Sequence, residues 1–262
     1  MGQNIGVFDS GLGGLSVYRE IKKLLPRHKI IYFADHKNAP YGTKSQSEIR
    51  SLTLAAIRFL LSKKCNPVVI ACNTATTGGI EYYRRKFPDI SFVGVVPPIK
   101  PAAKKGKNKK ILILSTPYTS KSAYLKKLIK DYATGCQIFN LGCPEFVELV
   151  EKGILVGTEV ERIIRKYLEQ PVEEGVDVVV LGCTHFPFLK MVIRKVAGKG
   201  IKILDPSQPV ASQVSSLYIN SMRSHYKNVQ TGDEFFTSEN TLGASDVASK
   251  LLKRKVIFQA GY

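Results

Sequence analysis

Short apolar runs recur along the chain and predict a set of buried β-strands. The runs are rich in Val and Ile, and their apolar residues follow one another without polar alternation. This pattern is typical of parallel strands in a sheet that is covered on both faces. We expect strands at Ile5–Phe8, Ile30–Phe33, Val68–Ala71, Phe92–Val96, Ile111–Leu114, Gln137–Leu141, Val178–Leu181 and Ile201–Leu204, and a short one near Phe235-Phe236.

Helical patterns lie between these runs. Ser45 and Glu48 have the spacing of a capping box, and the apolar residues that follow, from Ile49 to Leu61, fall on one helix face. Strands that alternate with helices in this way predict an α/β protein built on parallel sheets. Further helices are predicted at Leu15–Leu25, Ser120–Tyr132, Gly157–Glu169, Phe188–Ala197, Val210–His225 and Ala244–Leu252.

Two breaks marked by proline divide the chain, one at Pro97-Pro98 and one at Asp205-Pro206. A complete run of α/β units lies between them, so a second domain inserted into the first is the natural division. We therefore predict a first α/β domain made of residues 1–97 with 208–262, and a second, inserted α/β domain made of residues 98–207.

The two predicted domains repeat the same order of features. Each opens with an apolar strand that ends in small polar residues, Asp9-Ser10 in the first domain and Ser115-Thr116 in the second. Each later contains an apolar strand that runs into a cysteine, Cys72 in the first and Cys183 in the second. A duplicated unit would explain this repetition, and two copies that face each other would enclose a cleft.

The composition is that of a globular protein. The 262 residues are 44% hydrophobic, and no apolar run approaches the roughly 20 residues that a membrane helix needs. The residues from Met1 to Asn4 lead straight into a strand pattern and show no basic or apolar region of a signal peptide. We therefore expect a cytoplasmic protein that has no membrane partner.

The five cysteines contain no Cys-x-x-Cys pair, which argues against both a disulfide framework and a zinc knuckle. In a reducing cytosol these thiols stay free. Cys65, Cys136 and Cys143 lack a polar strand-end setting and are interpreted as structural.

The charge is unusual, because 39 Lys and Arg residues against 21 Asp and Glu residues give a formal net charge of +18. Such a balance suggests an anionic partner such as nucleic acid or a membrane surface. The one dense basic run, Lys104–Lys110, falls between two predicted strands, where a solvated linker is the simplest interpretation. The sequence has no RNA-binding aromatic signature, zinc-finger spacing or heptad repeat, so no specific nucleic-acid partner is predicted.

Polar clusters stand where the predicted strands end, which is where open parallel sheets bind their ligands. Helix N-caps and turns use the same residue types, so each cluster alone is weak evidence. Two cysteines at equivalent positions of two repeats are stronger evidence of a functional site than any single cluster. The clusters are Asp9-Ser10, Cys72-Asn73-Thr74, Ser115-Thr116 and Cys183-Thr184-His185, and Pro40-Tyr41-Gly42-Thr43 follows the second strand closely.

A symmetric pair of thiols suits the inversion of a carbon centre without a cofactor. One proton must leave one face of the carbon and another must reach the opposite face, so a base has to be paired with an acid across the substrate. A thiolate is a competent base whose pKa responds to helix placement and neighbouring charge. Asp9 and His185 are candidates to assist the thiols, and Asn73, Thr74 and Thr184 are candidates to stabilise the developing carbanion.

Two other chemistries share part of these motifs. Cys183 and His185 would make half of a zinc site, but no further Cys/His pair at suitable spacing completes it. The run Asp9–Gly14 is superficially like a phosphate loop, yet it lacks both the Gly-x-Gly-x-x-Gly spacing and a Gly-Lys-Ser/Thr ending. Its glycines are interpreted as permitting a tight turn and the close approach of a small ligand. No metal and no cofactor are predicted.

Together these residues resemble the motifs of the glutamate racemases, within the aspartate/glutamate racemase superfamily. The similarity runs over nearly the whole chain, and the combination of motifs is highly specific. The matching stretches are Gly6–Gly14, Tyr32–Asp35 leading to Pro40–Gly42, Cys72–Ala75, Cys143-Pro144 with Leu149–Glu151, and Gly182–Pro187.

The resemblance implies two pseudosymmetric α/β domains with glutamate bound in the cleft between them, and racemisation of glutamate without a cofactor. It also implies that Cys72 acts on the D-enantiomer and Cys183 on the L-enantiomer, while Asp9, Glu151 and His185 tune the thiols. D-Glutamate for peptidoglycan would be the product supplied, and homodimers of varied arrangement are implied as well. The implied substrate contacts are Asp9, Ser10, Pro40, Tyr41, Gly42, Cys72, Asn73, Thr74, Thr116, Cys183, Thr184 and His185, with Thr119 as an alternative to Thr116.

Some features stand apart from the family pattern. Val95–Pro101 follows one of the family's variants at the implied interdomain hinge, and Glu148 stands where a proline is common, so either Glu148 or Glu151 faces the cleft. A racemase for aspartate or hydantoins would keep both thiols and alter the pocket. The preference for glutamate rests on the wider match to the family, especially at the Tyr41-Gly42 segment and the C-terminal segment. Binding one glutamate does not account for the net charge of +18.

Overall fold

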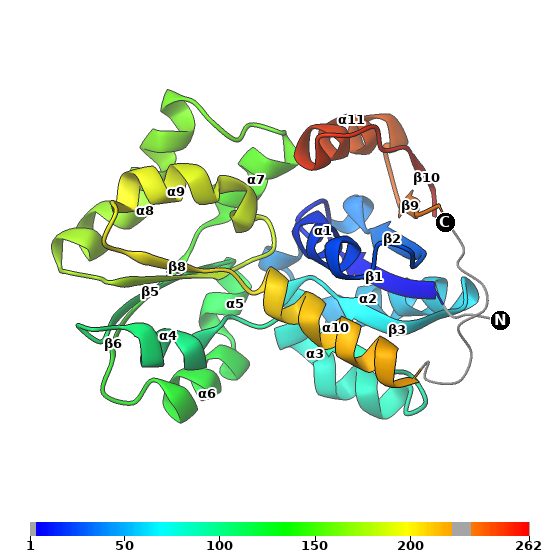
Figure 1. Cartoon of the computed structure of the whole chain (residues 1–262), viewed down its shortest axis with the longest axis horizontal. Helices are drawn as coiled ribbons and strands as arrows, with labels where there is room; N and C mark the ends of the chain where they lie inside the picture. Colours follow the sequence, from blue (N-terminus) through cyan, green and yellow to red (C-terminus); the bar gives the residue numbers. More distant parts are fainter. Residues whose placement is uncertain (1–3, 222–231, 262) are drawn as a thin grey trace.

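The computed structural model describes residues 4–221 and 232–261, which form two α/β units (Figure 1). Within these residues the larger sheet has six strands in the order β10-β9-β2-β1-β3-β4. All of its neighbouring strands are parallel. The strands are β1 (Asn4–Asp9), β2 (Ile30–Ala34), β3 (Cys65–Ile70), β4 (Phe92–Gly94), β9 (Glu234–Thr237) and β10 (Phe258–Ala260).

The smaller sheet, as far as the structure describes the chain, has four parallel strands in the order β6-β5-β7-β8. These strands are β5 (Lys110–Ser115), β6 (Gln137–Gly142), β7 (Val178–Gly182) and β8 (Lys202–Leu204). Two α/β units with parallel sheets are the predicted fold class, which is confirmed.

The two sheets repeat one arrangement of four strands. β1 lies between β2 and β3, with Phe8 in register with Phe33 and Ile70, and β5 lies between β6 and β7 in the same way. β3 and β7 are therefore equivalent strands. Cys72 follows the first of them and Cys183 follows the second, so the two thiols occupy equivalent places in the repeat.

Helices pack on both faces of the larger sheet because its strands bury alternate residues on opposite sides. Val7 of β1 belongs to the apolar core that includes α1 and α10, whereas Phe8 belongs to the core that includes α2. The helices of this unit are α1 (Leu15–Leu24), α2 (Gln46–Ser62), α3 (Asn73–Lys86), α10 (Ser207–Ser221) and α11 (Thr241–Leu252), with the short 3-10 turns η1 (His36–Asn38) and η2 (Tyr41–Thr43). Those of the other unit are α4 (Ile99–Lys105), α5 (Pro117–Lys121), α6 (Ala123–Tyr132), α7 (Pro144–Glu151), α8 (Thr158–Glu173), η3 (Phe186–Leu189) and α9 (Lys190–Ala197).

Two local predictions at helix ends have different outcomes. The capping box at the start of α2 is confirmed, since Ser45 accepts from the backbone N–H of Glu48 and the Glu48 side chain accepts from the backbone N–H of Ser45. The single helix predicted at Ser120–Tyr132 is wrong. The backbone of Ser122 is extended (φ −65°, ψ 141°), and its hydroxyl accepts from the N–H of Leu125, so the segment divides into α5 and α6.

The lysine-rich linker also needs correction, because Lys104 and Lys105 are the last residues of α4 rather than part of a connecting loop. The pattern did not predict α3, α4, α7 or β10. The first half of α3 consists of small and polar residues that are nearly all buried, so it lacks the apolar stripe that marks a helix lying on one face of a sheet.

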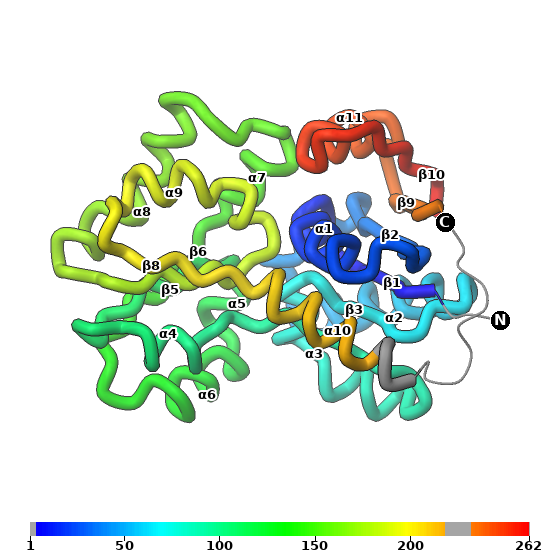
Figure 2. The backbone as a smooth tube through the Cα atoms, viewed as in Figure 1, coloured from blue at the N-terminus to red at the C-terminus, as the bar shows by residue number. Residues whose placement is uncertain are grey.

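The chain crosses between the two units at two places, after β4 and after β8 (Figure 2). The strands of the larger sheet come from residues 4–94 and 234–260, and those of the smaller sheet come from residues 110–204. The domain boundaries at 97/98 and 207/208 stay a prediction. Part of the predicted helix Val210–His225 lies in α10, and its last residues lie outside the described residues.

Hydrogen bonds of Asp233 connect the C-terminal segment to the first part of the chain. Its carboxylate accepts from the hydroxyl of Tyr18 (2.5 Å), the ammonium group of Lys22 (2.9 Å) and the backbone N–H of Ile30 (3.0 Å). Residues far apart in sequence are thereby held beside the larger sheet. None of the helices in residues 4–221 and 232–261 combines the length and apolarity needed to cross a bilayer.

Candidate active site

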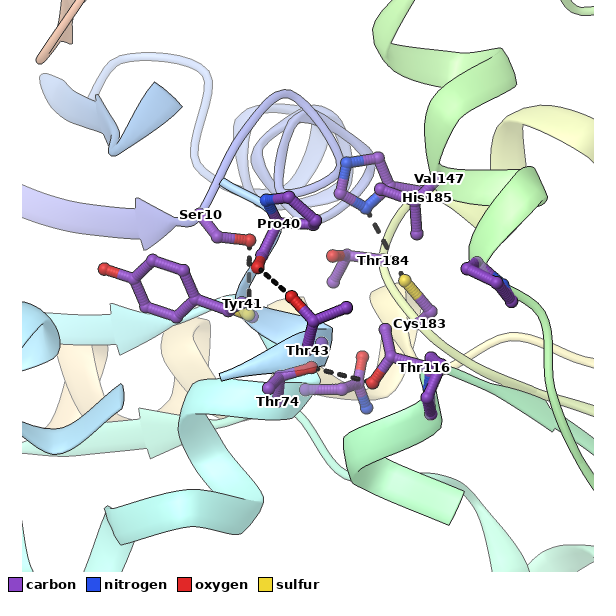
Figure 3. Close-up of a pocket in the computed structure, with 15 residues that line it drawn as sticks. Ser10, Pro40, Tyr41, Thr43, Thr74, Thr116, Val147, Cys183, Thr184 and His185 are labelled. Atoms are coloured by element: carbon purple, nitrogen blue, oxygen red, sulfur yellow. Dashed lines mark hydrogen bonds between the residues drawn. The ribbon is translucent and has the colours of Figure 1, made fainter. Parts of the chain in front are cut away.

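Cys72 and Cys183 both line one cavity, which is formed by residues from both units. Figure 3 shows the lining residues as sticks, with Cys183 and His185 among those labelled. Every predicted substrate contact except Asp9 lines the cavity. Cys72 comes from the end of β3 and Cys183 from the end of β7, as the repeat requires. The lining residues are Ser10, Pro40, Tyr41, Gly42, Thr43, Cys72, Asn73, Thr74, Thr116, Pro117, Pro144, Val147, Cys183, Thr184 and His185.

Four lining residues are not among the predicted substrate contacts. Thr43 directly follows Gly42 and Pro144 begins α7, so both lie in or beside stretches that the sequence already marked. Pro117 follows Thr116 at the start of α5. Val147 is an apolar residue of α7, and no sequence signal distinguishes it from a core residue.

Cys72 is the N-cap residue of α3. Its Sγ accepts a hydrogen bond from the backbone N–H of Ala75 (3.5 Å) and lies 3.6 Å from the hydroxyl oxygen of Ser10. Burial, followed by the negative charge of Asp9, raises the pKa of the Cys72 thiol to about 12, against the opposing effect of these two hydrogen bonds. In the protein alone this thiol is therefore protonated at neutral pH.

Asp9 lies beneath the cavity rather than in its wall. One carboxylate oxygen accepts from the backbone N–H of Gly11 (2.9 Å) and the other accepts from the hydroxyl of Thr184 (3.0 Å). Burial raises the pKa of Asp9, and the positive charge of His185 opposes that rise. Asp9 is fully buried and is not among the residues that line the cavity, and its predicted contact with a substrate stays a prediction. Its hydrogen bond with Thr184 joins the two repeats.

Cys183 has a positively charged neighbour, which Cys72 lacks. Its Sγ lies 3.5 Å from Nδ1 of His185, and Nε2 of the same ring lies 2.5 Å from Oε1 of Glu151. Burial lowers the pKa of His185, but the negative charges and hydrogen bonds of Cys183 and Glu151 outweigh burial and raise it well above its usual value. The imidazolium form of His185 is thus the favoured one, beside the thiol.

Glu151 is the carboxylate next to this histidine, whereas Glu148 is on the exposed side of α7. Besides contacting His185, Oε1 of Glu151 accepts from the backbone N–H of Leu12 (2.7 Å). Burial would raise the pKa of Glu151, yet its bonds to His185 and His36 hold that pKa far below the usual range. The carboxylate is therefore ionised and lies behind His185, outside the cavity wall.

Tyr41 and Gly42 shape the opposite wall. The Tyr41 hydroxyl donates to a carboxylate oxygen of Asp35 (2.6 Å), so it anchors η2 instead of offering its hydroxyl to the cavity. A Cβ on Gly42 would lie 2.9 Å from the Cβ of Thr116, which is closer than real Cβ contacts. Glycine is needed here because the two units meet at this point.

Hydroxyl groups from both units meet beside Cys72. The Thr74 hydroxyl oxygen lies 2.9 Å from that of Thr116, and Thr116 donates to Thr119 (3.1 Å). Of the two alternatives, Thr116 lines the cavity and Thr119 lies behind it. Asn73 donates from Nδ2 to the carbonyl oxygen of Val95 (3.3 Å), and its buried Oδ1 has no partner within the described part of the chain.

The glycines after Asp9 also have a packing role that the sequence did not predict. A Cβ on Gly11 would lie 2.1 Å from Oε1 of Glu151, and a Cβ on Gly13 would lie 2.3 Å from Nδ1 of His185. These glycines admit side chains of the other unit. The predicted close approach of a small ligand to them stays a prediction. No sequence rule for a single loop reveals such a contact.

Comparisons with known proteins agree with this architecture. Residues 5–214 match the Asp/Glu/Hydantoin racemase family. The chain belongs to that family. The paired cysteines and the duplicated parallel sheets are consistent with this assignment.

Within the family the chain groups with the glutamate racemases. It is 40% identical over 249 residues to a glutamate racemase of Clostridium novyi, covering 95% of this chain and 96% of that protein. Its fold matches the glutamate racemase isoform RacE1 of Bacillus anthracis with a TM-score of 0.87 at 28% identity, covering 98% of this chain and 97% of that one. It also matches an Escherichia coli glutamate racemase, solved with L-glutamate and the activator UDP-MurNAc-Ala, with a TM-score of 0.84 at 35% identity over 96% and 95% of the two chains.

Proposed function

We propose that this protein interconverts L-glutamate and D-glutamate by proton transfer between two cysteines. The observation that carries the proposal is the placement of Cys72 and Cys183 at equivalent strand ends of a repeat, both lining one cavity. The glutamate racemases that the chain resembles over nearly their whole length support glutamate as the substrate.

In the proposed reaction, one cysteine thiolate removes the α-proton and the other cysteine thiol delivers a proton to the opposite face of the carbanion. Cys183 removes the proton of L-glutamate and Cys72 that of D-glutamate. Each turnover leaves the first sulfur protonated and the second ionised, which is the arrangement needed for the reverse direction. No external acid or base is consumed.

Hydrogen bonds and helix ends would hold the substrate. The lining residues include no Lys or Arg, so the substrate carboxylates would be bound by hydroxyls and backbone N–H groups. The start of α3 offers such N–H groups beside Asn73 and Thr74, where the helix dipole favours an anion. The free Oδ1 of Asn73 is suited to accept a hydrogen bond from the substrate ammonium group.

The proposal extends to the cellular setting of the enzyme. We infer that it works in the cytoplasm, supplies D-glutamate for peptidoglycan, and needs neither a metal nor a cofactor. A homodimer and the absence of a specific nucleic-acid partner are part of the same proposal, despite the net charge of +18.

The test is incubation of the purified protein with L-glutamate in deuterated water, with a chelator present and no added cofactor. Loss of optical rotation together with entry of solvent deuterium at the α-carbon is expected. A folded protein that changes neither enantiomer of glutamate would refute the proposal. Parallel incubations with aspartate and with a hydantoin test the sibling activities.

A further inference from the structure

His36 is a second histidine at the Glu151 carboxylate, and nothing in the reaction described so far uses it. It opens η1, just after β2, and its Nε2 lies 3.3 Å from Oε2 of Glu151. Its Nδ1 lies 2.7 Å from the hydroxyl oxygen of Thr237, and its ring packs edge-on against Phe258. The ring is held on three sides, and it does not line the cavity.

The hydrogen bonds define which nitrogens of His36 carry hydrogen. The Thr237 hydroxyl donates its single hydrogen to the carbonyl oxygen of Glu239 (2.8 Å), so its oxygen accepts from Nδ1 of His36. The ionised carboxylate of Glu151 can only accept, so Nε2 of His36 must donate to it. Both ring nitrogens therefore carry hydrogen, which is the imidazolium form.

Glu151 consequently stands between two histidines, with His185 on Oε1 and His36 on Oε2. The charged groups around this carboxylate are His185, His36 and the more distant Asp9. Two cations at one carboxylate repel each other, so each protonated ring is stabilised there less than it would be if the other were absent.

We propose that His36 is a positioning residue for the Cys183 half of the reaction, since its positive charge on Glu151 limits how firmly that carboxylate holds the protonated ring of His185. The role rests on the proposed racemase function, because it matters only if Cys183 must alternate between thiolate and thiol. If the thiolate–imidazolium pair is too stable, Cys183 becomes a weaker base and its thiol form becomes scarce. The positive charge of His36 counteracts that excess stability.

The first measurement needs no substrate. The chain has only four histidines, so their ring signals in nitrogen-15 NMR can be assigned by single substitutions. His36→Asn removes the charge and keeps a polar group near Thr237, and it should raise the pH at which His185 titrates by roughly one unit. His28→Asn is the matched control, because His28 precedes β2 at the opposite end of that strand. An unchanged His185 titration in His36→Asn would overturn the proposal, whatever the substrate is.

The second measurement separates a charge effect on one half of the reaction from a general loss of structure. L-Glutamate and D-glutamate have equal free energies, so in any variant the values of kcat/KM for the two directions must equal each other. The Cys72 and Cys183 halves of the reaction are therefore compared through isotope effects. In His36→Asn, kcat should fall about tenfold, because a shift of roughly one unit in the titration of His185 corresponds to a factor of about ten. The isotope effect on kcat/KM with α-deuterated L-glutamate should rise, and that with the D-enantiomer should fall. Isotope effects that move together, or not at all, would refute a role on the Cys183 side.

A third variant distinguishes the charge of His36 from its hydrogen bond. His36→Gln can still donate to Glu151 but is neutral, so it should resemble His36→Asn in both measurements. If His36→Gln behaves like the wild-type protein, the charge is not responsible and the proposal fails. Inactivity of the wild-type protein on glutamate would instead refute the racemase function, while the titration of His185 would still test the coupling through Glu151.

Discussion

The contact between Gly13 and His185 gives a sharp test of the site geometry. The backbone φ of Gly13 lies outside the left-handed region, so alanine would add a methyl group there without backbone strain. That Cβ would lie 2.3 Å from Nδ1, 2.6 Å from Cε1 and 2.7 Å from Cγ of His185. Since ordinary contacts begin near 3.4 Å, the ring would have to move by about 1 Å, a misplacement that can cost a factor on the order of 100 in rate.

Gly13→Ala should therefore lower kcat by roughly a hundredfold, because the displaced ring loses its alignment with both Cys183 and Glu151. Their present distances from the ring are 3.5 Å and 2.5 Å. Turnover would be followed by polarimetry from each enantiomer, with thermal unfolding as a check that the variant is folded.

Gly200→Ala is the matched control for this test. A Cβ on Gly200 would meet no heavy atom within 4 Å, and its φ is also outside the left-handed region. We expect it to keep the wild-type rate. A folded Gly13→Ala protein with at least half of the wild-type kcat would show that the site tolerates a displaced His185, and the reasoning from its geometry would be wrong.

Three further predictions concern the thiols and the charges beside them. Cys72→Ala and Cys183→Ala should each abolish racemisation without loss of fold, since inversion needs an acid and a base on opposite faces; near-normal turnover by either variant would remove that thiol from the scheme. Asp9→Asn should lower the pKa of Cys72 below its present value of about 12, because the negative charge of Asp9 is the second-largest cause of the raised pKa after burial. Alkylation of Cys72, followed by mass spectrometry across a pH series, should then begin at lower pH than in the wild type, and an unchanged profile would contradict this. Glu151→Gln should lower the pKa of His185, because the ionised carboxylate favours the protonated ring, and should reduce kcat by roughly a hundredfold; an unchanged titration of His185 in NMR would count against the assigned network.

The repeat and the paired cysteines could be predicted from the sequence because both are local patterns that recur. Buried parallel strands are continuous apolar runs, and ligands gather where such strands end. Cys72 and Cys183 could therefore be placed on equivalent strands without any three-dimensional information. The same rule suggested Ser10 and Thr116, which also line the cavity.

The second layer of the site could not be predicted in this way. Glu151 ends a helix that has no strong sequence signal, and it reaches His185 only because α7 packs beside η3. His36 and Thr237 approach each other because β9 pairs with β2, although some 200 residues separate them in sequence. The purpose of Gly11 and Gly13 is likewise defined by side chains of the other unit, and a local rule for glycine can report only that a turn or a close contact is present.

The two halves of the site have equivalent backbone arrangements, but the charged groups beside the two thiols differ. Cys72 is surrounded by neutral donors and by the negative charge of Asp9, and its pKa is about 12, so its thiol is protonated at neutral pH. On the other side, the protonated ring of His185 lies beside Cys183, with its Nδ1 3.5 Å from the sulfur. The protein therefore supplies a positive charge beside Cys183, the thiol that we propose to act on L-glutamate. For D-glutamate, the ammonium group of the bound substrate would have to provide the positive charge that Cys72 lacks in the protein.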